Sequence, residues 1–250
     1  MIIDFNAHFL RKRGLSQSDS GVDCPLFRCS TFWRDADELV AIEKAAGIDL
    51  AVVSDLATAF HNASLEGGPL PDNLIQFASL SPTFESHALP IVKGLRIYPT
   101  YHTWDFDGDA TTKLLSLARE RNLILQIYLR LRDPRALPLT VGLVEVIKQT
   151  QKLTDTCEDM RFVVSGASYA EIKANPALFG QQNVWTDISH VQHPTNSLPK
   201  LLELIDSTRV LFGSGAPVLY PYSNVYRVIN SPISDEVRER VLWRNAQELL

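Results

Sequence analysis

The stretch GLRIYPTYHTWDFDGDATTKLLSLARERNLILQIY, residues 94–128, contains one complete strand–helix–strand unit. Its two ends, residues 94–98 and 123–128, are short apolar runs of the length that strands have. Between them, the segment from Ala110 to Arg121 repeats apolar residues at the spacing of an amphipathic helix. This order of elements indicates a parallel βαβ unit.

The same alternation extends in both directions along the chain. Further strands are expected near residues 2–6, 49–54, 74–79, 161–165, 183–188 and 208–213. Helical patterns lie between them, at Asp35–Ala46, Val141–Lys152 and Leu198–Asp206. Eight strands that alternate with helices predict an α/β fold in which a single domain, residues 1–250, closes into a (β/α)8 TIM barrel. The alternative is an open doubly wound sheet, but no glycine-rich phosphate-binding motif follows the first strand.

The composition narrows the classes of partner. The chain carries 24 basic and 29 acidic residues, a net charge of -5, and its longest basic run is the three residues 11–13. This charge pattern does not favour binding to nucleic acid or to a membrane surface, and a small-molecule ligand is expected. Asp4 ends the first apolar stretch before it could form a signal peptide, and three cysteines do not indicate a disulfide framework. We therefore expect a cytoplasmic protein.

Residue parity along each strand predicts which side chains face the barrel interior, because side chains alternate between the two faces. In the fifth strand, Gln126 and Tyr128 have the parity opposite to a run of leucine and isoleucine. The same rule gives three more inward rows: Asp4, Asn6 and His8; Arg96 and Tyr98; Trp185 and Asp187. Buried polar groups are costly unless they bond to one another, to water or to a ligand. The sequence thus predicts either a hydrogen-bonded plug or a ligand site in the barrel.

Six segments, in order, resemble the amidohydrolase superfamily, and more narrowly its amidohydrolase-related branch of metal-dependent hydrolases. They are IDFNAH (3–8), KAAGIDLAVVS (44–54), FASLSP (77–82), GLRIYP (94–99), RVLFGSGAP (209–217) and NAQELL (245–250). The resemblance spans nearly the whole chain. It implies an eight-stranded barrel and hydrolytic chemistry.

The resemblance also implies where relatives hold a divalent metal: two histidines of the first strand, histidines ending the fifth and sixth, and an aspartate ending the eighth. The residues that match these positions here are Asn6, His8, Gln126, Ser165 or Gly166, and Gly215. Of these, His8 alone is an ordinary zinc ligand, whereas a catalytic zinc needs about three protein ligands. We therefore expect no metal cofactor at this position. The glycine at 215 also removes the carboxylate that transfers protons in relatives.

Catalysis without this metal would need another titratable group. His8 is the expected catalytic base, because an imidazole changes charge near neutral pH. Asp187 could orient His8 or act itself. The alternative for His8 is a neutral core histidine bonded to Asn6, Asp4 or Gln126.

Arg96 indicates the class of ligand. A guanidinium binds carboxylates through two parallel hydrogen bonds, so a small carboxylated or otherwise anionic ligand is expected. Arg130 and Arg132 continue past the fifth strand and could add to the positive charge. The alternative role of Arg96 is a structural ion pair with Asp4 or Asp187. The residues expected to bind the substrate are Asn6, Arg96, Tyr98 and Gln126.

Three functions fit these patterns. The first is a hydrolase that acts on a small carboxylated or lactone-type substrate without the usual divalent metal. The second is a catalytically silent barrel that binds a metabolite or a protein partner. The third is a metal enzyme with displaced ligands from His8, Asp187, His190 and His193. The sequence leaves open whether the chain forms a homo-oligomer.

Overall fold

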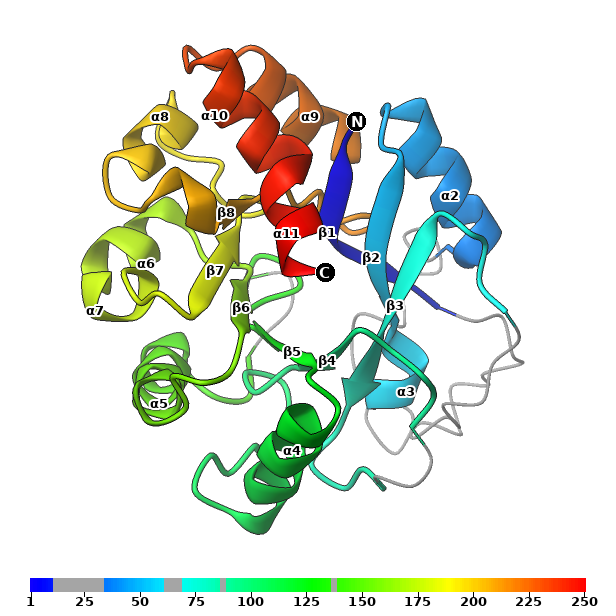
Figure 1. Cartoon of the computed structure of the whole chain (residues 1–250), viewed down its shortest axis with the longest axis vertical. Coiled ribbons are helices and arrows are strands. Elements are labelled where there is room, and N and C mark those ends of the chain that lie inside the picture. Colours follow the sequence, from blue (N-terminus) through cyan, green and yellow to red (C-terminus); the bar gives the residue numbers. More distant parts are fainter. Residues whose placement is uncertain (11–33, 61–68, 86–88, 136–138) are drawn as a thin grey trace.

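Eight parallel strands form a single sheet that curls into a ring, with helices around its outside (Figure 1). This computed structural model describes residues 1–10, 34–60, 69–85, 89–135 and 139–250. Each strand pairs with its neighbours in sequence, in the order β1 to β8. The strands are β1 (Ile3–Phe9), β2 (Leu50–Asp55), β3 (Leu74–Leu80), β4 (Gly94–Ile97), β5 (Ile124–Tyr128), β6 (Phe162–Ser165), β7 (Val184–Asp187) and β8 (Val210–Leu211). The predicted TIM barrel is confirmed.

The ring closes between β1 and the chain that follows β8. The Phe5 amide donates to the Phe212 carbonyl at 2.9 Å, and the His8 amide donates to the Ala216 carbonyl at 2.8 Å. A parallel bridge between Ala7 and Ala216 adds to this seam. The strand that opens the chain therefore lies beside the strand that ends the barrel, as a closed barrel requires.

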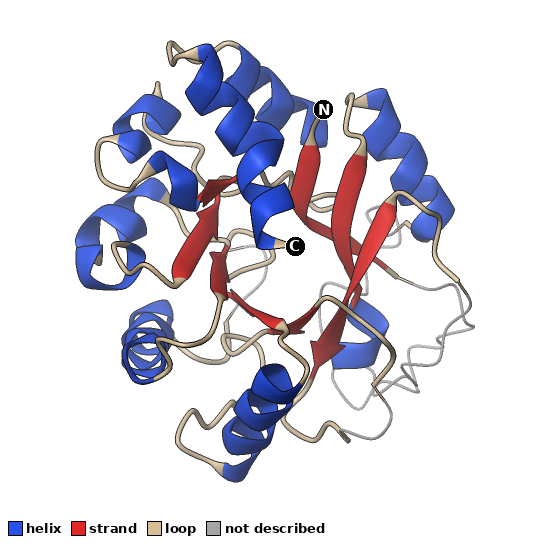
Figure 2. Ribbon diagram, viewed as in Figure 1, coloured by secondary structure: helices blue, strands red, loops and turns tan. Residues whose placement is uncertain are grey.

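Helices follow the strands along the sequence and cover the outside of the ring (Figure 2). They are α2 (Ala36–Ala45), α3 (Leu56–Phe60), α4 (Asp109–Glu120), α5 (Leu143–Thr156), α6 (Tyr169–Ala174), α7 (Pro176–Phe179), α8 (Ser197–Leu202), α9 (Pro221–Ile229), α10 (Asp235–Glu239) and α11 (Asn245–Leu249). Helix α2 lies within the predicted helical pattern Asp35–Ala46, and Asp35 and Glu38 form a reciprocal capping box at its start. It is followed by Gly47 in the left-handed region at φ +80°.

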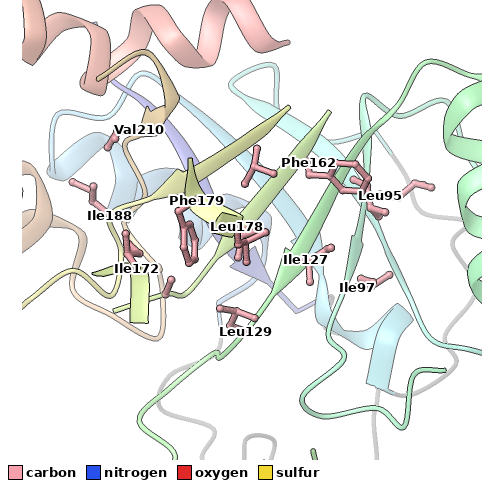
Figure 3. Close-up of a cluster of buried hydrophobic side chains, with 14 of the residues drawn as sticks. Leu95, Ile97, Ile127, Leu129, Phe162, Ile172, Leu178, Phe179, Ile188 and Val210 are labelled. Atoms are coloured by element: carbon pink, nitrogen blue, oxygen red, sulfur yellow. The ribbon is translucent and has the colours of Figure 1, made fainter. Parts of the chain in front are cut away.

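Two apolar layers hold the barrel. The outer layer packs strand residues such as Leu95, Ile127 and Phe162 against helix residues that include Ile172 and Phe179 (Figure 3). The inner layer fills the N-terminal end of the barrel with Ile3, Phe5, Val52, Phe77, Ile124, Val163 and Leu211, and α11 covers it with Ala246 and Leu249. Because apolar side chains fill this end, polar groups can gather only toward the C-terminal ends of the strands.

A β-bulge interrupts β1, since its register against β2 shifts between Asp4 and Ala7. Phe5 belongs to the inner apolar layer, and the next residue, Asn6, also bonds to groups inside the barrel. The bulge resets the alternation, so Asp4 lies instead on the helix-facing side, next to Glu43 of α2. The prediction that Asp4 shares an inward row with Asn6 and His8 is therefore wrong for Asp4, because parity holds only along an unbroken strand.

Some of the sequence features lie outside the described residues, among them Cys24, Cys29, His61 and His87. Cys157 is a buried free thiol at the end of α5. Within the described ranges, no helix is both long and apolar enough to cross a membrane.

Candidate functional site

Polar side chains from five strands meet inside the barrel, above the apolar layer. Each of them is at most 1% exposed to solvent. They are Asn6 and His8 from β1, Ser54 from β2, Arg96 and Tyr98 at β4, Gln126 and Tyr128 from β5, and Asp187 from β7. We call this set the barrel site.

Arg96 is the central cation of the barrel site. Its Nε donates to Gln126 Oε1 at 2.8 Å, and one Nη donates both to Ser54 Oγ at 2.8 Å and to the Ala7 carbonyl at 2.9 Å. The other Nη reaches only the Val52 carbonyl, at 3.5 Å. All these acceptors are neutral. The second Nη is therefore the part of the guanidinium with the weakest bonding.

Arg96 forms no ion pair with any carboxylate of the described residues. The alternative role of Arg96, a structural ion pair with Asp4 or Asp187, is thus not observed, because the bulge turns Asp4 away and Asp187 bonds elsewhere. Burying a cation without a counter-charge is costly, so its positive charge is open to an anionic partner.

Asn6 joins β1 to β5 and β7. Its Nδ2 donates to Asp187 Oδ2 at 3.1 Å and to Ser189 Oγ at 3.0 Å, while its Oδ1 accepts from the Tyr128 hydroxyl at 2.6 Å. Burial and the Asp187 charge raise the pKa of Tyr128 well above its usual value, so the phenol stays protonated and donates. The orientation of the Asn6 amide is therefore fixed at both ends.

His8 is buried and has no hydrogen-bond partner on either ring nitrogen among the described residues. Its ring packs edge-on against Tyr128, with centroids 4.9 Å apart, and lies 6.2 Å from the ring of Tyr98. Burial lowers the pKa of His8 well below 6.5, and the positive charge of Arg96 lowers it further. The imidazole is therefore neutral at pH 7, and its nitrogens are free to bond to a ligand.

The structure brings all six residues named in advance into one site: Asn6, His8, Arg96, Tyr98, Gln126 and Asp187. Tyr98 joins through its hydroxyl, which lies 2.9 Å from Ser54 Oγ and 3.2 Å from Ser79 Oγ. Asp187 does not orient His8 directly, since its Oδ1 accepts the Ser189 amide at 2.8 Å and its Oδ2 accepts from Asn6. The alternative bonds from His8 to Asn6, Asp4 or Gln126 are absent too among the described residues.

Sequence reasoning missed Tyr128 as a member of the site. Parity placed it inward, but the fifth-strand ligand position was assigned to Gln126, two residues earlier. In the structure Gln126 lies deeper, bonded to Arg96 and, at 2.6 Å, to Ser165 Oγ, whereas Tyr128 contacts Asn6 and His8. Which side chains of β5 and β1 meet across the barrel interior depends on the stagger of the strands, which the sequence does not display.

The residues present do not fit the divalent metal that the resemblance implies. The Asn6 amide nitrogen, a donor, faces Asp187, and its oxygen already accepts from Tyr128. Gly215 has φ +74°, and a Cβ added there would lie 2.8 Å from Leu219 Cδ1. Within the described part of the chain, no group of three His, Cys, Asp or Glu side chains is placed to hold a metal.

The sixth-strand candidates do not change this result. Ser165 Oγ is occupied by the Gln126 amide. Gly166 has φ +79°, and a Cβ there would lie 2.7 Å from the carbonyl oxygen of Arg130. A larger ligand side chain at 166 would therefore require the backbone after β5 to move.

The other basic groups near the mouth have separate partners. His190 Nδ1 lies 3.2 Å from Ser189 Oγ, and burial lowers the pKa of His190 to about 4. Arg130 forms an ion pair with Glu171 of α6. His102 packs its ring against Phe60, with centroids 4.8 Å apart. None of these is joined to the barrel site by a direct bond to His8 or Arg96.

An eight-stranded parallel barrel with a polar site at the C-terminal ends of its strands is the architecture of barrel enzymes. Residues 85–250, more than half of the chain, match the family model described as Amidohydrolase, and the chain belongs to this family. No curated protein matches the sequence.

Solved structures share the fold at low sequence identity. The 5-carboxyvanillate decarboxylase from Sphingomonas paucimobilis is 14% identical, with a TM-score of 0.70 over 99% of this chain and 98% of that one. A dihydroxybenzoic acid decarboxylase from Polaromonas sp. JS666, solved with manganese and 2-nitroresorcinol, is 14% identical, with a TM-score of 0.70 over 99% and 96%. A probable 2-pyrone-4,6-dicarboxylic acid hydrolase from Acinetobacter baumannii with citric acid bound is 12% identical, with a TM-score of 0.62 over 99% and 98%.

Proposed function

We propose that this amidohydrolase-family barrel, acting as one domain over residues 1–250, hydrolyses a small carboxylated or lactone-type substrate without a divalent metal. One observation carries the proposal. The buried guanidinium of Arg96 has no carboxylate partner among the described residues, and it lies near a buried imidazole, His8, whose two nitrogens are unbonded. An anionic substrate would satisfy both groups.

Substrate binding in this proposal rests on charge and hydrogen bonds. The second Nη of Arg96, bonded only to the Val52 carbonyl at 3.5 Å, would donate to the substrate carboxylate. Gln126 holds the guanidinium plane through Nε, and the hydroxyls of Ser54 and Tyr98 form the wall beside it. Because these groups are shielded from water, the attraction between Arg96 and a carboxylate is strong.

The hydrolytic step uses His8 as a neutral base. A water molecule gives a proton to the imidazole while its oxygen bonds to the substrate carbonyl carbon. The carbon–oxygen bond of the lactone or ester then breaks, and the imidazolium returns the proton to the departing oxygen. The lowered pKa of His8 makes the imidazolium a strong acid for this return. Arg96 supplies positive charge to the oxyanion that forms in between.

The structural neighbours are consistent with this substrate class, because the names of three of them refer to small carboxylated molecules. The net charge of -5 favours a small molecule over nucleic acid as the partner. In this proposal the protein is cytoplasmic.

The experiment uses 2-pyrone-4,6-dicarboxylate as the probe, with a chelator present throughout. The wild type should bind the probe and hydrolyse it. His8→Gln should bind it without hydrolysis, and Arg96→Met should do neither. Arg135→Met is the control, since that side chain is 90% exposed and its ion pair is with the neighbouring Asp133, outside the barrel site. Hydrolysis that the chelator stops, or that His8→Gln retains, would contradict the proposal.

A second candidate is a catalytically silent barrel that binds a metabolite. One observation favours it: many polar groups of the barrel site already have partners within the protein. These are the side chains of Asn6, Gln126, Tyr128 and Asp187, which bond to one another or to their neighbours. Binding of the dicarboxylate that needs Arg96, without turnover by the wild type, would support this candidate over the hydrolase.

A further inference from the structure

Two acidic side chains are buried together between the barrel and α2, outside the barrel site. Asp4 is fully buried, and Glu43, in the last turn of α2, is 1% exposed. The bulge in β1 turns Asp4 toward the helix, where Leu39 and Glu43 are the buried positions of α2. The proposed hydrolytic step uses neither carboxyl group, so their burial needs another explanation.

One carboxyl oxygen of each acid has no hydrogen-bond donor among the described residues. Asp4 Oδ1 accepts the amides of Asn6 at 2.8 Å and Ser214 at 2.9 Å, and Ser214 Oγ lies 3.4 Å from Glu43 Oε1. The remaining oxygens, Asp4 Oδ2 and Glu43 Oε2, have no donor among the described residues. The two carboxyl groups are neighbours, because both bond to Ser214, and the negative charge of Asp4 acts on Glu43. Two carboxyl groups can bond to each other only when one of them carries a proton.

We propose that Asp4 and Glu43 share one proton, and that this proton holds α2 against the start of the barrel. The hydrogen bond would run from one carboxyl group to the other and would satisfy both donorless oxygens. Asp4 at the same time holds the amides of Asn6 and Ser214, which belong to β1 and to the chain after β8. The shared proton thus lies at the seam where the barrel closes.

The charges around the pair favour retention of the proton. Asp187 of β7 is negative and acts on Asp4 from inside the barrel. From α9, Arg227 points to the carbonyls of Ile188 and Val191 and to Asn224, and no Lys or Arg of the described residues forms an ion pair with either acid. On α2 itself, Lys44 lies on the exposed side. No described cation therefore neutralises a second negative charge.

The pKa shifts give the direction of the pH effect. Burial raises the pKa of Asp4 to about 6, and burial and the charge of Asp4 raise the pKa of Glu43 well above 4.5. An acid whose pKa is higher in the folded state binds its proton more tightly there than in the unfolded chain. The stabilisation is therefore complete at low pH and is lost as the pH rises, first past about 6 and then past the pKa of Glu43.

The test is chemical denaturation of the full chain from pH 6 to pH 9. Glu43→Gln keeps the shape of the side chain and can donate to Asp4 at every pH. The unfolding constant of the wild type should rise with pH, relative to that of Glu43→Gln, by up to about tenfold per pH unit, because one extra proton is released on unfolding. Glu120→Gln, at an exposed position on α4, is the matched control and should follow the wild type. Parallel curves for the wild type and Glu43→Gln would overturn the proposal.

A second measurement on the wild type does not depend on how a variant folds. Infrared spectra at pH 7 should show the carbonyl band of a protonated carboxylic acid. This band should shift in protein that carries 13C-labelled glutamate side chains, or in protein that carries 13C-labelled aspartate side chains. The band should disappear at alkaline pH. A spectrum with no protonated carboxyl at pH 7 would show that the two acids do not share a proton.

Discussion

The side-chain amide of Asn6 donates to the Asp187 carboxylate across 3.1 Å and so joins the first strand to the seventh inside the barrel. In the family, the position of Asn6 is expected to hold a metal-binding histidine. Here the group that faces Asp187 is an N–H donor, which repels a cation rather than binding it. In this chain Asn6 links β1 to β5 and β7 through its side-chain amide.

Metal content is the first consequence to check. We expect protein purified without chelator to contain no stoichiometric zinc or manganese, because His8 is the one imidazole of the site and zinc needs about three protein ligands. Elemental analysis measures this directly. One metal ion per chain, lost in His8→Ala, would refute the expectation.

Restoring the carboxylate of the eighth strand should harm the fold. Gly215→Asp places a Cβ at φ +74° and 2.8 Å from Leu219 Cδ1, so we expect a loss of about 1–3 kcal/mol in the free energy of unfolding. Denaturant titration measures it. Gly142→Asp is the control, since that glycine is the N-cap of α5 and an added Cβ there meets nothing within 4 Å. Aspartate is favoured at an N-cap. Equal stability of Gly215→Asp and wild type would show that the glycine is not required.

Local patterns were sufficient to predict the elements of the fold. Apolar runs and the helical repeat between residues 94 and 128 correspond to β4, α4 and β5, with bounds that differ by at most one residue. The helical pattern from Asp35 to Ala46 corresponds to α2, with Asp35 as its N-cap and Gly47 following it at positive φ. These features depend on residues close in sequence, so the sequence displays them.

The barrel site depends on distances between strands, and here the sequence was less informative. Inward parity correctly brought Asn6, Arg96 and Gln126 together, since alternation holds along β4, β5 and the second half of β1. It failed at Asp4, because one bulge reverses the face and leaves no clear sequence mark. The bond between Tyr128 and Asn6 joins residues 122 positions apart and follows from barrel stagger.

The Tyr128 hydroxyl should contribute measurably to stability. Tyr128→Phe keeps the ring that packs against His8 but removes the 2.6 Å bond to Asn6 Oδ1, a buried acceptor. We expect a loss of about 1–2 kcal/mol in the free energy of unfolding. Tyr226→Phe, at a tyrosine 61% exposed, is the control and should change little. If both variants have the same free energy of unfolding as the wild type, the bond contributes nothing to stability.

His8 should stay neutral at an acidic pH at which a free imidazole is protonated. Burial, followed by the charge of Arg96, lowers the pKa of His8 well below 6.5 in the folded protein, whereas the unfolded chain has the ordinary value. Below about pH 6.5 the unfolded state therefore binds a proton that the folded state does not, and stability falls as the pH falls. Ring 15N shifts of His8 should show neutral imidazole at pH 6, and His8→Gln should reduce the acid dependence of unfolding. A charged ring at pH 6 in the folded protein would contradict both His8 as a neutral base and the buried site that creates it.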